Sequence, residues 1–370
     1  MLYVELHACS AFSFLRGGSF PEQLAEVAAE LEMPALALLD RNGVYGAQRF
    51  SVAAREHNVR PIIGAELSME DGAILPVLVE NRTGYKNLCE LLTQAHLRSE
   101  KGKCAVQWNE LPRFADGLVV LLGSACLQRA GDSESFRESR TFRASSTGRS
   151  SFRQNAETST LQACAPQNAQ DRARLLIDAF GCENVFVEIQ RHFIRGQERM
   201  DRALVDFAHA NRLSILATNG VQYATPSERE VLDVFTCIRE HIHLDAAGKL
   251  LTQNAERHLK SDRQMREMFA DLPEAIENTV RLAKRLTFSL ENIGYEFPSY
   301  PVPAGQSMDS FLRTMVWFGA QQRYAAISTP VKRKLEEELA LITKLGFAGY
   351  FLIVWDIINF CREHNIMVQG

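Results

Sequence analysis

The sequence predicts an α/β fold over its first 225 residues and a mostly helical chain after them. Short apolar runs alternate with amphipathic segments up to about residue 225, which is the pattern of strands separated by helices. No dinucleotide-binding glycine motif accompanies these repeats. The combination favours a closed barrel of parallel strands over an open sheet, although periodicity alone does not separate the two.

Seven short apolar runs are the predicted strands. They are three to six residues long, a length typical of buried strands and too short for most helices. The seven runs are Tyr3–His7, Ala35–Leu39, Pro61–Ile63, Ile74–Val79, Leu118–Leu122, Val185–Ile189 and Leu213–Ala217.

The first predicted helix begins at Ser19-Phe-Pro-Glu22. A serine followed three residues later by a glutamate is a capping-box signature, and Pro21 suits a first turn because no N–H donor is needed there. Apolar residues then recur at helical spacing from Leu24 to Leu31. Similar patterns predict helices over Tyr85–His96 and Gln197–Ala210.

Residues 131–170 interrupt this alternation. They hold eight serines, five arginines and four acidic residues, with almost no apolar periodicity. Such a segment buries too little apolar area to offset its ordering entropy, roughly 1–2 kcal/mol per residue for the backbone. We therefore expect a disordered insertion, and its nearly neutral charge favours this interpretation over a nucleic-acid-binding tail.

After residue 225 the patterns are mostly helical. Residues 297–305 hold three prolines, which remove N–H donors and disfavour helix at the residue before them, so an extended linker and a domain boundary are expected there. The predicted domains are a barrel (1–225), a helical extension that closes it (226–296), and the linker with the remaining helices (297–370). The predicted helices are Ser227–Arg239, Asp262–Ala270, Leu272–Leu286, Met308–Tyr324 and Pro330–Leu345.

Composition narrows the class of protein. The formal net charge of −4 argues against a chain that holds nucleic acid over most of its surface, since that requires clustered Lys and Arg. Eight cysteines without a C-x-x-C pair indicate neither a disulfide framework nor a zinc knuckle. The amino terminus lacks a signal sequence, and no run reaches 18 apolar residues. A cytoplasmic protein without a membrane span is expected.

Several segments resemble the PHP (polymerase and histidinol phosphatase) domain family. Glu5-Leu-His-Ala-Cys-Ser is similar to its opening motif, His-x-His-Thr-x-x-Ser, and lies at the end of the first predicted strand, where barrel enzymes place catalytic side chains. The run Leu345–Gly370 resembles the entrance to the palm of bacterial C-family DNA polymerases, and its residues are more similar to those of the error-prone branch. Further matches follow in family order at residues 35–46, 60–66, 83–88, 187–192 and 216–223.

This resemblance implies a PHP-type distorted (β/α)7 barrel followed by a mostly helical, partial palm segment. The parent protein would be a DNA-directed DNA polymerase, a nucleotidyltransferase, that acts in DNA repair, translesion synthesis and damage-induced mutagenesis. Its implied cofactor is Mg²⁺, and its implied partners are the rest of the polymerase chain, a DNA primer-template, a sliding clamp and mutagenesis accessory proteins. The family's catalytic aspartates would follow Gly370, so this chain is expected to be an inactive structural scaffold without a cofactor of its own.

The resemblance also points to a degraded metal site. Active PHP domains hold a metal cluster through His, carboxylate and sometimes Cys ligands, which can activate water for phosphoester hydrolysis. His7, Glu66 and His192 stand at ligand positions, whereas Cys9 replaces the second His of the opening motif and could serve as a thiolate. The positions at which active members have His, Cys or Asp are held here by Ile74, Ser124, Gly220 and Gln222.

Arg41 is the most consequential replacement, because it stands where the family has the His that follows Asp40. A guanidinium stays protonated and cannot ligate a metal, and we expect it to pair with Asp40 and oppose a dication. His7, Glu66 and His192 would then form a hydrogen-bonded or ion-paired remnant with Arg41. The alternative is a free-standing PHP metal-dependent phosphoesterase or exonuclease, which requires an intact cluster.

Two other groups of residues are candidates for a functional site. His241 and His243 lie two apart, but no third ligand is near them in the sequence, so a surface loop or strand is favoured over a metal pair. A basic run near residue 333 is most simply a solvated helix face with i,i+4 ion pairs. The resemblance makes four of its residues candidates for contact with DNA phosphate: Lys332, Arg333, Lys334 and Lys344.

Overall fold

The computed structural model describes residues 2–123, 126, 169–293 and 298–368. These residues form two compact units, Met1–Asn292 and Ile293–Gly370, which are described separately. Most of the predicted disordered insertion, residues 131–168, lies outside the described residues. Ala169 and Gln170, which were assigned to that insertion, begin a helix instead because the amphipathic pattern of α6 (Ala169–Phe180) starts there.

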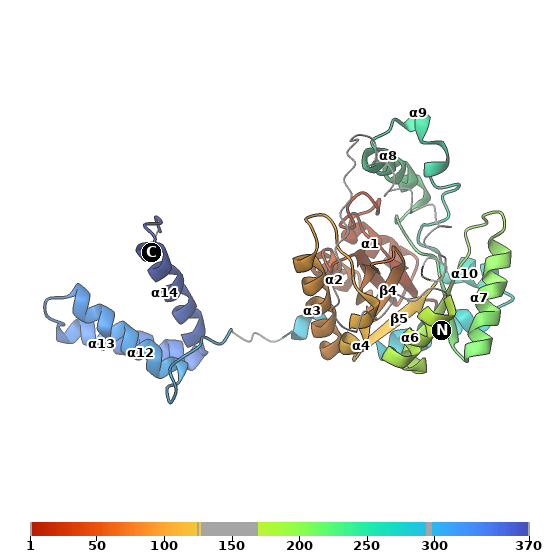
Figure 1. Ribbon diagram of the computed structural model, residues 1–370. Helices are drawn as coiled ribbons and strands as arrows, with labels where there is room; N and C mark the ends of the chain where they lie inside the picture. Colours follow the sequence, from red (N-terminus) through yellow and green to blue (C-terminus); the bar gives the residue numbers. More distant parts are fainter. Residues whose placement is uncertain (1, 124–125, 127–168, 294–297, 369–370) are drawn as a thin grey trace, which may run out of the picture. The chain divides into compact units, whose positions relative to one another are not determined.

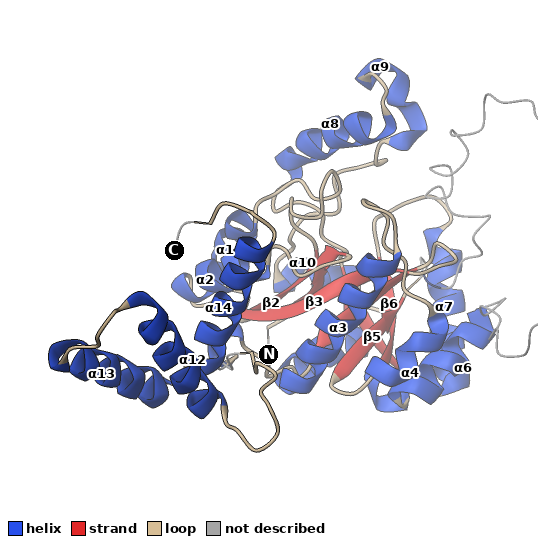
Figure 2. Cartoon of the chain, turned by 60° about the vertical axis from the view of Figure 1, so that its left-hand side comes forward, coloured by secondary structure: helices blue, strands red, loops and turns tan. Residues whose placement is uncertain are grey.

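The first unit is built on a seven-stranded sheet, and several of its strands are labelled in Figures 1 and 2. The strands lie in chain order, β1 to β7. All seven predicted strands are present, which confirms the α/β fold class. Their bounds are β1 (Glu5–Ala8), β2 (Ala35–Arg41), β3 (Arg60–Ser68), β4 (Ile74–Val79), β5 (Leu118–Leu122), β6 (Val185–Gln190) and β7 (Ser214–Thr218).

The expectation of an all-parallel sheet was wrong at one strand. β4 runs antiparallel to both β3 and β5, whereas the other neighbours are parallel. Only five residues, 69–73, join β3 to β4, which is long enough for a hairpin but too short for the crossover that a parallel pair requires. β3 is consequently much longer than the predicted Pro61–Ile63, because it extends into that hairpin.

The sheet closes into a barrel between its first and last strands. Ala8 forms a parallel bridge with Val221, just beyond the end of β7. The Val221 N–H donates to the His7 carbonyl at 2.8 Å, and the Cys9 N–H donates to the Val221 carbonyl at 2.9 Å. Closure therefore takes place at the carboxyl end of β1, directly beside His7.

Side chains alternate between the barrel interior and the surrounding helices, as the period of two in a strand requires. On β2, for example, Ala37 and Leu39 face the interior, whereas Leu36 and Leu38 face the helices. The apolar layer of the interior lies at the end where the parallel strands begin, and α11 (Pro273–Arg285) packs against it. It comprises Val4, Leu6, Ala35, Ala37, Leu39, Ile62, Leu78, Val119, Leu121, Phe186, Leu216, Leu282, Ala283 and Leu286.

Helices cover the outside of the barrel, as Figure 2 shows. α1 (Pro21–Glu30) starts one residue later than its predicted capping box implies, because Phe20 is the N-cap and its N–H donates to Gln23. Ser19 instead donates its hydroxyl hydrogen to Glu228. The other helices of this unit are α2 (Ala47–Glu56), α3 (Arg82–Arg98), α4 (Leu111–Phe114), α6, α7 (Gln197–Asn211), α8 (Arg229–Glu240), α9 (Leu244–Ala247), α10 (Asp262–Met268) and α11.

The second unit contains three helices, α12 (Met308–Arg323), α13 (Thr329–Leu345) and α14 (Ala348–Glu363). The sequence predicted the first two, whereas α14 was not assigned. α13 ends at Gly346, whose φ of +70° is the left-handed conformation that terminates many helices. The buried core of this unit is small: Leu312, Leu339, Ala348 and Leu352.

Within the described ranges, no single helix is long and apolar enough to cross a membrane. α13 and α14 reach such a length and composition only when they are taken together, across a bend of 117°.

Candidate functional site

A cavity of about 620 Å³ lies at the end of the barrel where the parallel strands finish. This volume is in the range of small-molecule sites, roughly 300–1,000 Å³. Leu232 and Thr236 of α8 contribute to its wall, together with residues from the strand ends. Eight of the nine positions singled out from the sequence line it: His7, Cys9, Arg41, Glu66, Ile74, His192, Gly220 and Gln222. The ninth, Ser124, lies outside the described residues.

A β-bulge directs His7 into this cavity. Glu5 pairs with Leu36 and Ala8 pairs with Leu38, so three steps along β1 match two steps along β2. Because one extra residue shifts the alternation, Leu6 and His7 both face the interior, whereas Ala8 faces the helices. The carboxylate of Glu5 accepts the His7 N–H at 2.8 Å and thereby fixes the bulged backbone.

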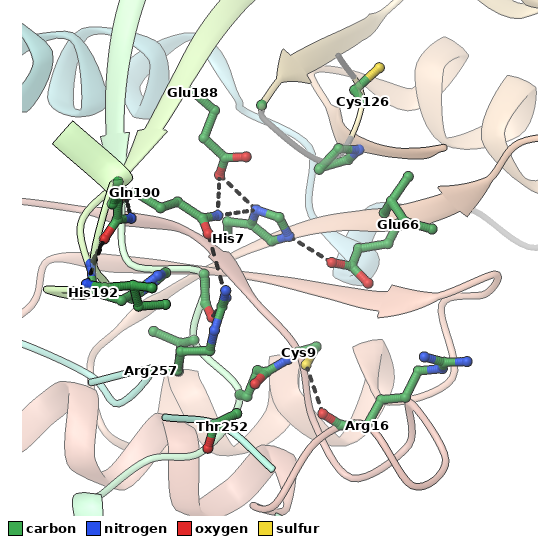
Figure 3. A pocket seen from close by; sticks show the side chains of 18 of the residues that line it. His7, Cys9, Arg16, Glu66, Cys126, Glu188, Gln190, His192, Thr252 and Arg257 are labelled. Carbon is green, nitrogen blue, oxygen red and sulfur yellow. Dashed lines mark hydrogen bonds and ion pairs between the residues drawn. The ribbon is translucent and has the colours of Figure 1, made fainter. Parts of the chain in front are cut away.

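Both ring nitrogens of His7 face carboxylates, as Figure 3 shows. Nδ1 lies 2.6 Å from Glu188 Oε1, and Nε2 lies 2.8 Å from Glu66 Oε1. Glu66 also accepts a hydrogen bond from Arg41 Nε at 2.7 Å through its other oxygen. Glu188, His7, Glu66 and Arg41 thus form a continuous chain of alternating charge, which we call the His7 network.

The His7 network holds its histidine as an imidazolium. Burial alone would lower the pKa of His7, but the charges of Glu188 and Glu66 and the hydrogen bonds to them raise this pKa from 6.5 to about 10. Burial opposes ionisation of Glu66, yet Arg41 and His7 hold the pKa of that carboxyl well below its usual range. His7 likewise lowers the pKa of Glu188 against the effect of burial. An imidazolium donates at both nitrogens and has no lone pair for a metal.

Arg41 does not pair with Asp40, so that expectation was wrong. Successive residues of β2 point to opposite faces, which sends Arg41 into the cavity and Asp40 toward the helices. Asp40 accepts hydrogen bonds from the Ser10 N–H at 3.0 Å, the Ser13 hydroxyl at 2.8 Å and the Gly46 N–H at 2.9 Å. Its role is to anchor the loop after β1 to the end of β2.

Glu188 and Gln190 were missed in the sequence, although a signal for them was present. Glu188, Gln190 and His192 alternate along β6 and its extension, so one inward-facing residue of this set implies the other two. Glu188 accepts hydrogen bonds from the Thr218 hydroxyl and from Gln190 Nε2, in addition to its contact with His7. Glu188 is therefore in hydrogen-bond contact with three side chains, those of His7, Gln190 and Thr218.

His192 does not join the expected remnant with His7 and Glu66. Its Nε2 lies 2.8 Å from the Asn219 carbonyl, which requires a hydrogen on that nitrogen. Burial, followed by the positive charge of Arg257, lowers the pKa of His192 to about 3, so the ring is neutral. A neutral histidine that donates to a backbone carbonyl is a structural link between β6 and the loop after β7.

At Cys9 and Gly220, two positions where active PHP domains have metal ligands, the structure disfavours a ligand. Burial and then the charges of Glu66 and Asp40 raise the pKa of the Cys9 thiol, so a thiolate is disfavoured. Gly220 has a φ of +54°, and a Cβ added there would come within 2.5 Å of Gln190 Oε1. Gln190 thus occupies the space that a side chain at Gly220 would need.

The side chains of this cavity do not fit a metal cluster. His7 is protonated between two carboxylates, and Arg41 neutralises Glu66. In the part of the chain that the structure describes, no three His, Cys, Asp or Glu side chains are arranged to hold a metal ion. The hydrogen bonds and ion pairs of the His7 network join the ends of β1, β2, β3 and β6 to one another.

None of the other candidates is among the residues that line this cavity. His241 ends α8 in a left-handed conformation and His243 is the N-cap of α9, and both side chains are outside the cavity wall. Arg333 lies on α13, where it forms an i,i+4 pair with Glu337 at 3.6 Å, in line with a solvated helix face. Lys332, Lys334 and Lys344 are exposed on the same helix.

Known proteins resemble this chain over both units. The profile of the PHP domain matches residues 5–192, and the profile of the bacterial DNA polymerase III alpha NTPase domain matches residues 310–370. The whole chain is 35% identical to 32% of an error-prone DNA polymerase from Mycolicibacterium paratuberculosis and, to the same extent, to one from Mycobacterium tuberculosis H37Rv. It is 34% identical to 33% of another from Symbiobacterium thermophilum. The chain therefore spans about a third of the length of the curated relatives that it matches.

Proposed function

The chain belongs to the PHP domain family, and on that premise we propose that it is the amino-terminal part of an error-prone DNA polymerase, with its PHP barrel as a structural scaffold. Two features support this proposal. The similarity to error-prone DNA polymerases runs over the full 370 residues. The second unit, which a free-standing PHP enzyme would not need, matches a polymerase profile.

The scaffold role is carried by one observation, the chain of alternating charge through His7. In an active PHP domain the corresponding side chains would be metal ligands, whereas here His7 is shared between Glu188 and Glu66. The ion pairs join strands that the metal cluster would otherwise join. The barrel mouth therefore keeps its shape without a metal, and the hydrolytic activity of other PHP proteins is not expected.

The activity of the whole polymerase belongs to this proposal as well. We infer that the complete protein extends a DNA primer-template during translesion synthesis, repair and damage-induced mutagenesis, in the cytoplasm. Mg²⁺ would be held by carboxylates of the polymerase palm. A sliding clamp and mutagenesis accessory proteins would be partners of the complete protein.

The second unit has an exposed apolar surface that suits this assignment. On α14, Tyr350 is 50% exposed, Ile357 is 56% exposed and Phe360 is 55% exposed. A soluble domain rarely leaves this much apolar surface uncovered without a partner. We propose that the rest of the palm packs against α14 in the complete polymerase, because the matching relatives are about three times as long as this chain.

Primer extension and nuclease assays on two proteins test the proposal. The 370-residue chain is expected neither to extend a primed template nor to degrade DNA, with Mg²⁺, Mn²⁺ or Zn²⁺ present. A chimera that joins these residues to the matching remainder of the M. tuberculosis relative should gain primer extension and still lack exonuclease activity. Metal-dependent nuclease activity in the unmodified chain, abolished by His7→Ala, would contradict the scaffold role and favour a PHP phosphoesterase or exonuclease.

A further inference from the structure

The helix α8 presents a second apolar stripe to solvent, on the side turned away from the barrel cavity. Leu232 and Thr236 of this helix line the cavity. On another face, Val231, Val234 and Ile238 recur at spacings of three and four residues and are 40%, 49% and 52% exposed. Figures 1 and 2 both show α8 and α9 at the margin of the first unit, beyond its strands. Apolar residues gathered on one exposed helix face indicate a contact surface.

An apolar groove continues this stripe at the carboxyl end of α8. The chain turns there through His241, whose left-handed conformation ends the helix. The Ile242 N–H donates to the Cys237 carbonyl at 3.0 Å and holds the turn against α8. The groove has a volume of about 440 Å³, so it can accept an aliphatic side chain from a partner helix. Its lining includes Val234, Ile238, His241 and Leu244.

The two ends of this face carry complementary polar side chains. Glu230 lies at the amino end of the stripe and His241 lies about three turns later, and both are exposed. Among the residues that the structure describes, neither side chain takes part in a hydrogen bond or an ion pair. A carboxylate accepts the N–H of an imidazole, so each end can bind the opposite end of an identical helix.

The arginines of α8 point to other parts of the barrel unit. Arg229 Nη2 donates to the Thr252 carbonyl at 2.8 Å, and Arg239 Nη1 donates to the Leu15 carbonyl at 2.9 Å. Nucleic acids and anionic membrane surfaces are bound through clustered Lys and Arg. The charge on the exposed stripe is instead that of Glu230, which disfavours both of them as the occupant.

We propose that this face pairs two copies of the chain, with their α8 helices antiparallel. A two-fold axis brings the same surface of both copies together, so the amino half of each α8 lies over the carboxyl half of the other. In the register that sets Val234 of one copy beside Ile238 of the other, Val231 reaches the groove of the other copy. Glu230 then lies next to His241 of the other copy. Each contact is formed twice, and the proposal does not depend on the polymerase assignment.

Sedimentation velocity of the full chain over a concentration series tests the proposal. A weak, reversible monomer–dimer equilibrium is expected, because two helices of 12 residues bury less than the roughly 1,200–2,000 Å² of stable interfaces. Ile238→Glu should weaken it by about tenfold or more, since it places a charge in an apolar contact. The matched control is Ile357→Glu on α14, where the isoleucine is 56% exposed, and it should leave the equilibrium unchanged.

An exchange of the two end groups tests the antiparallel order. Glu230→Arg removes the carboxylate from each end, and His241→Glu sets two carboxylates against each other, so each variant should weaken association about threefold. The double variant has an arginine opposite a glutamate at both ends and should restore the affinity to within about twofold of wild type. In a parallel pair, identical residues would face each other and the double variant would restore nothing.

Three results would overturn the proposal: a chain that stays monomeric at every concentration, weakening by Ile238→Glu no greater than by Ile357→Glu, or a double variant that associates no better than the single ones. Circular dichroism checks the fold of each variant. If Ile238→Glu does not fold, Val234→Glu takes its place with the same control.

The chimera with the remainder of the M. tuberculosis relative gives the last arm. Association that is still weakened by Ile238→Glu supports the pairing of two copies in the longer protein. Loss of association in the chimera would assign the α8 face to a contact with the rest of the chain and would overturn the proposal. A failed primer-extension assay leaves these outcomes unaffected.

Discussion

At the scale of single residues, we propose that the imidazolium of His7 holds two buried carboxylates together. A cation is needed at the barrel mouth because Glu66 and Glu188 approach it from two strands, and two buried carboxylates repel each other. The imidazolium lies between them at hydrogen-bond distance from both. Arg41 supplies a second positive charge, which pairs with Glu66 and opposes a dication at that carboxylate.

The ion pairs of His7 should make the free energy of unfolding depend on pH. The folded pKa of His7 is raised from 6.5 to about 10, so the stabilisation by its charge is complete below about pH 6.5 and is lost as the pH rises toward 10. The pKa values of Glu66 and Glu188 are lowered, so their contribution is present above their usual value of 4.5 and is lost as the pH falls below it. Urea unfolding should therefore show a falling free energy of unfolding between pH 7 and pH 10.

His7→Gln should abolish most of this dependence. It should also lower the free energy of unfolding by about 3 kcal/mol at pH 7, because it leaves the buried Glu188 without a cation and Glu66 with Arg41 alone. His57→Gln is the matched control: this histidine is exposed, and its replacement should change stability by less than about 0.5 kcal/mol. If the free energy of unfolding changed with pH in the same way in the wild type and in His7→Gln, the assignment of the charge to His7 would be contradicted.

At the scale of elements, the contact between the ends of β6 and β7 prevents simple restoration of a metal site. Gly220 follows β7 in a left-handed conformation, and the amide of Gln190 fills the space beside it. That amide cannot move freely, since it donates to Glu188 and Thr218. Replacing Cys9, Arg41, Gly220 and Gln222 by His, His, Asp and His is thus not expected to rebuild a cluster while Gln190 remains.

Gly220→Ala tests this packing. The substitution should destabilise the protein by about 2–3 kcal/mol, which combines the strain of a positive φ with displacement of Gln190. Gly196→Ala is the control, because Gly196 has a φ of +85° but open space around it, and its cost should be about 1 kcal/mol from strain alone. Equal losses of stability in thermal or urea unfolding would show that Gln190 does not close this position.

The strands illustrate how far the sequence could predict this site. Apolar runs located all seven strands, and motif positions brought eight residues to one cavity. The bulge in β1 could not be predicted, because the extra residue depends on pairing with β2 rather than on β1 itself. The partner of Arg41 was missed for a similar reason: only strand pairing shows that Arg41 lies opposite Glu66 and that Asp40 faces away.

At the scale of the whole molecule, the two units differ in how completely they bury apolar surface. The barrel unit has an interior layer and an extensive outer layer between strands and helices. In the described part of the second unit, the buried core is a cluster of four apolar residues, and aromatic side chains of α14 are exposed. The sequence did not predict α14, because the apolar residues of that run are nearly continuous rather than periodic.

We propose that an internal ion-pair network, rather than a metal cluster, holds the barrel mouth together. The most direct test is the metal content of the purified chain after exposure to Zn²⁺, Mn²⁺ and Fe²⁺ and dialysis, measured by inductively coupled plasma mass spectrometry. If the ion pairs hold the mouth together, we expect no stoichiometric metal in the chain. The unfolding midpoint should then be the same with and without a chelator. About two or three ions per chain that resist the chelator and are lost in His7→Gln would contradict it.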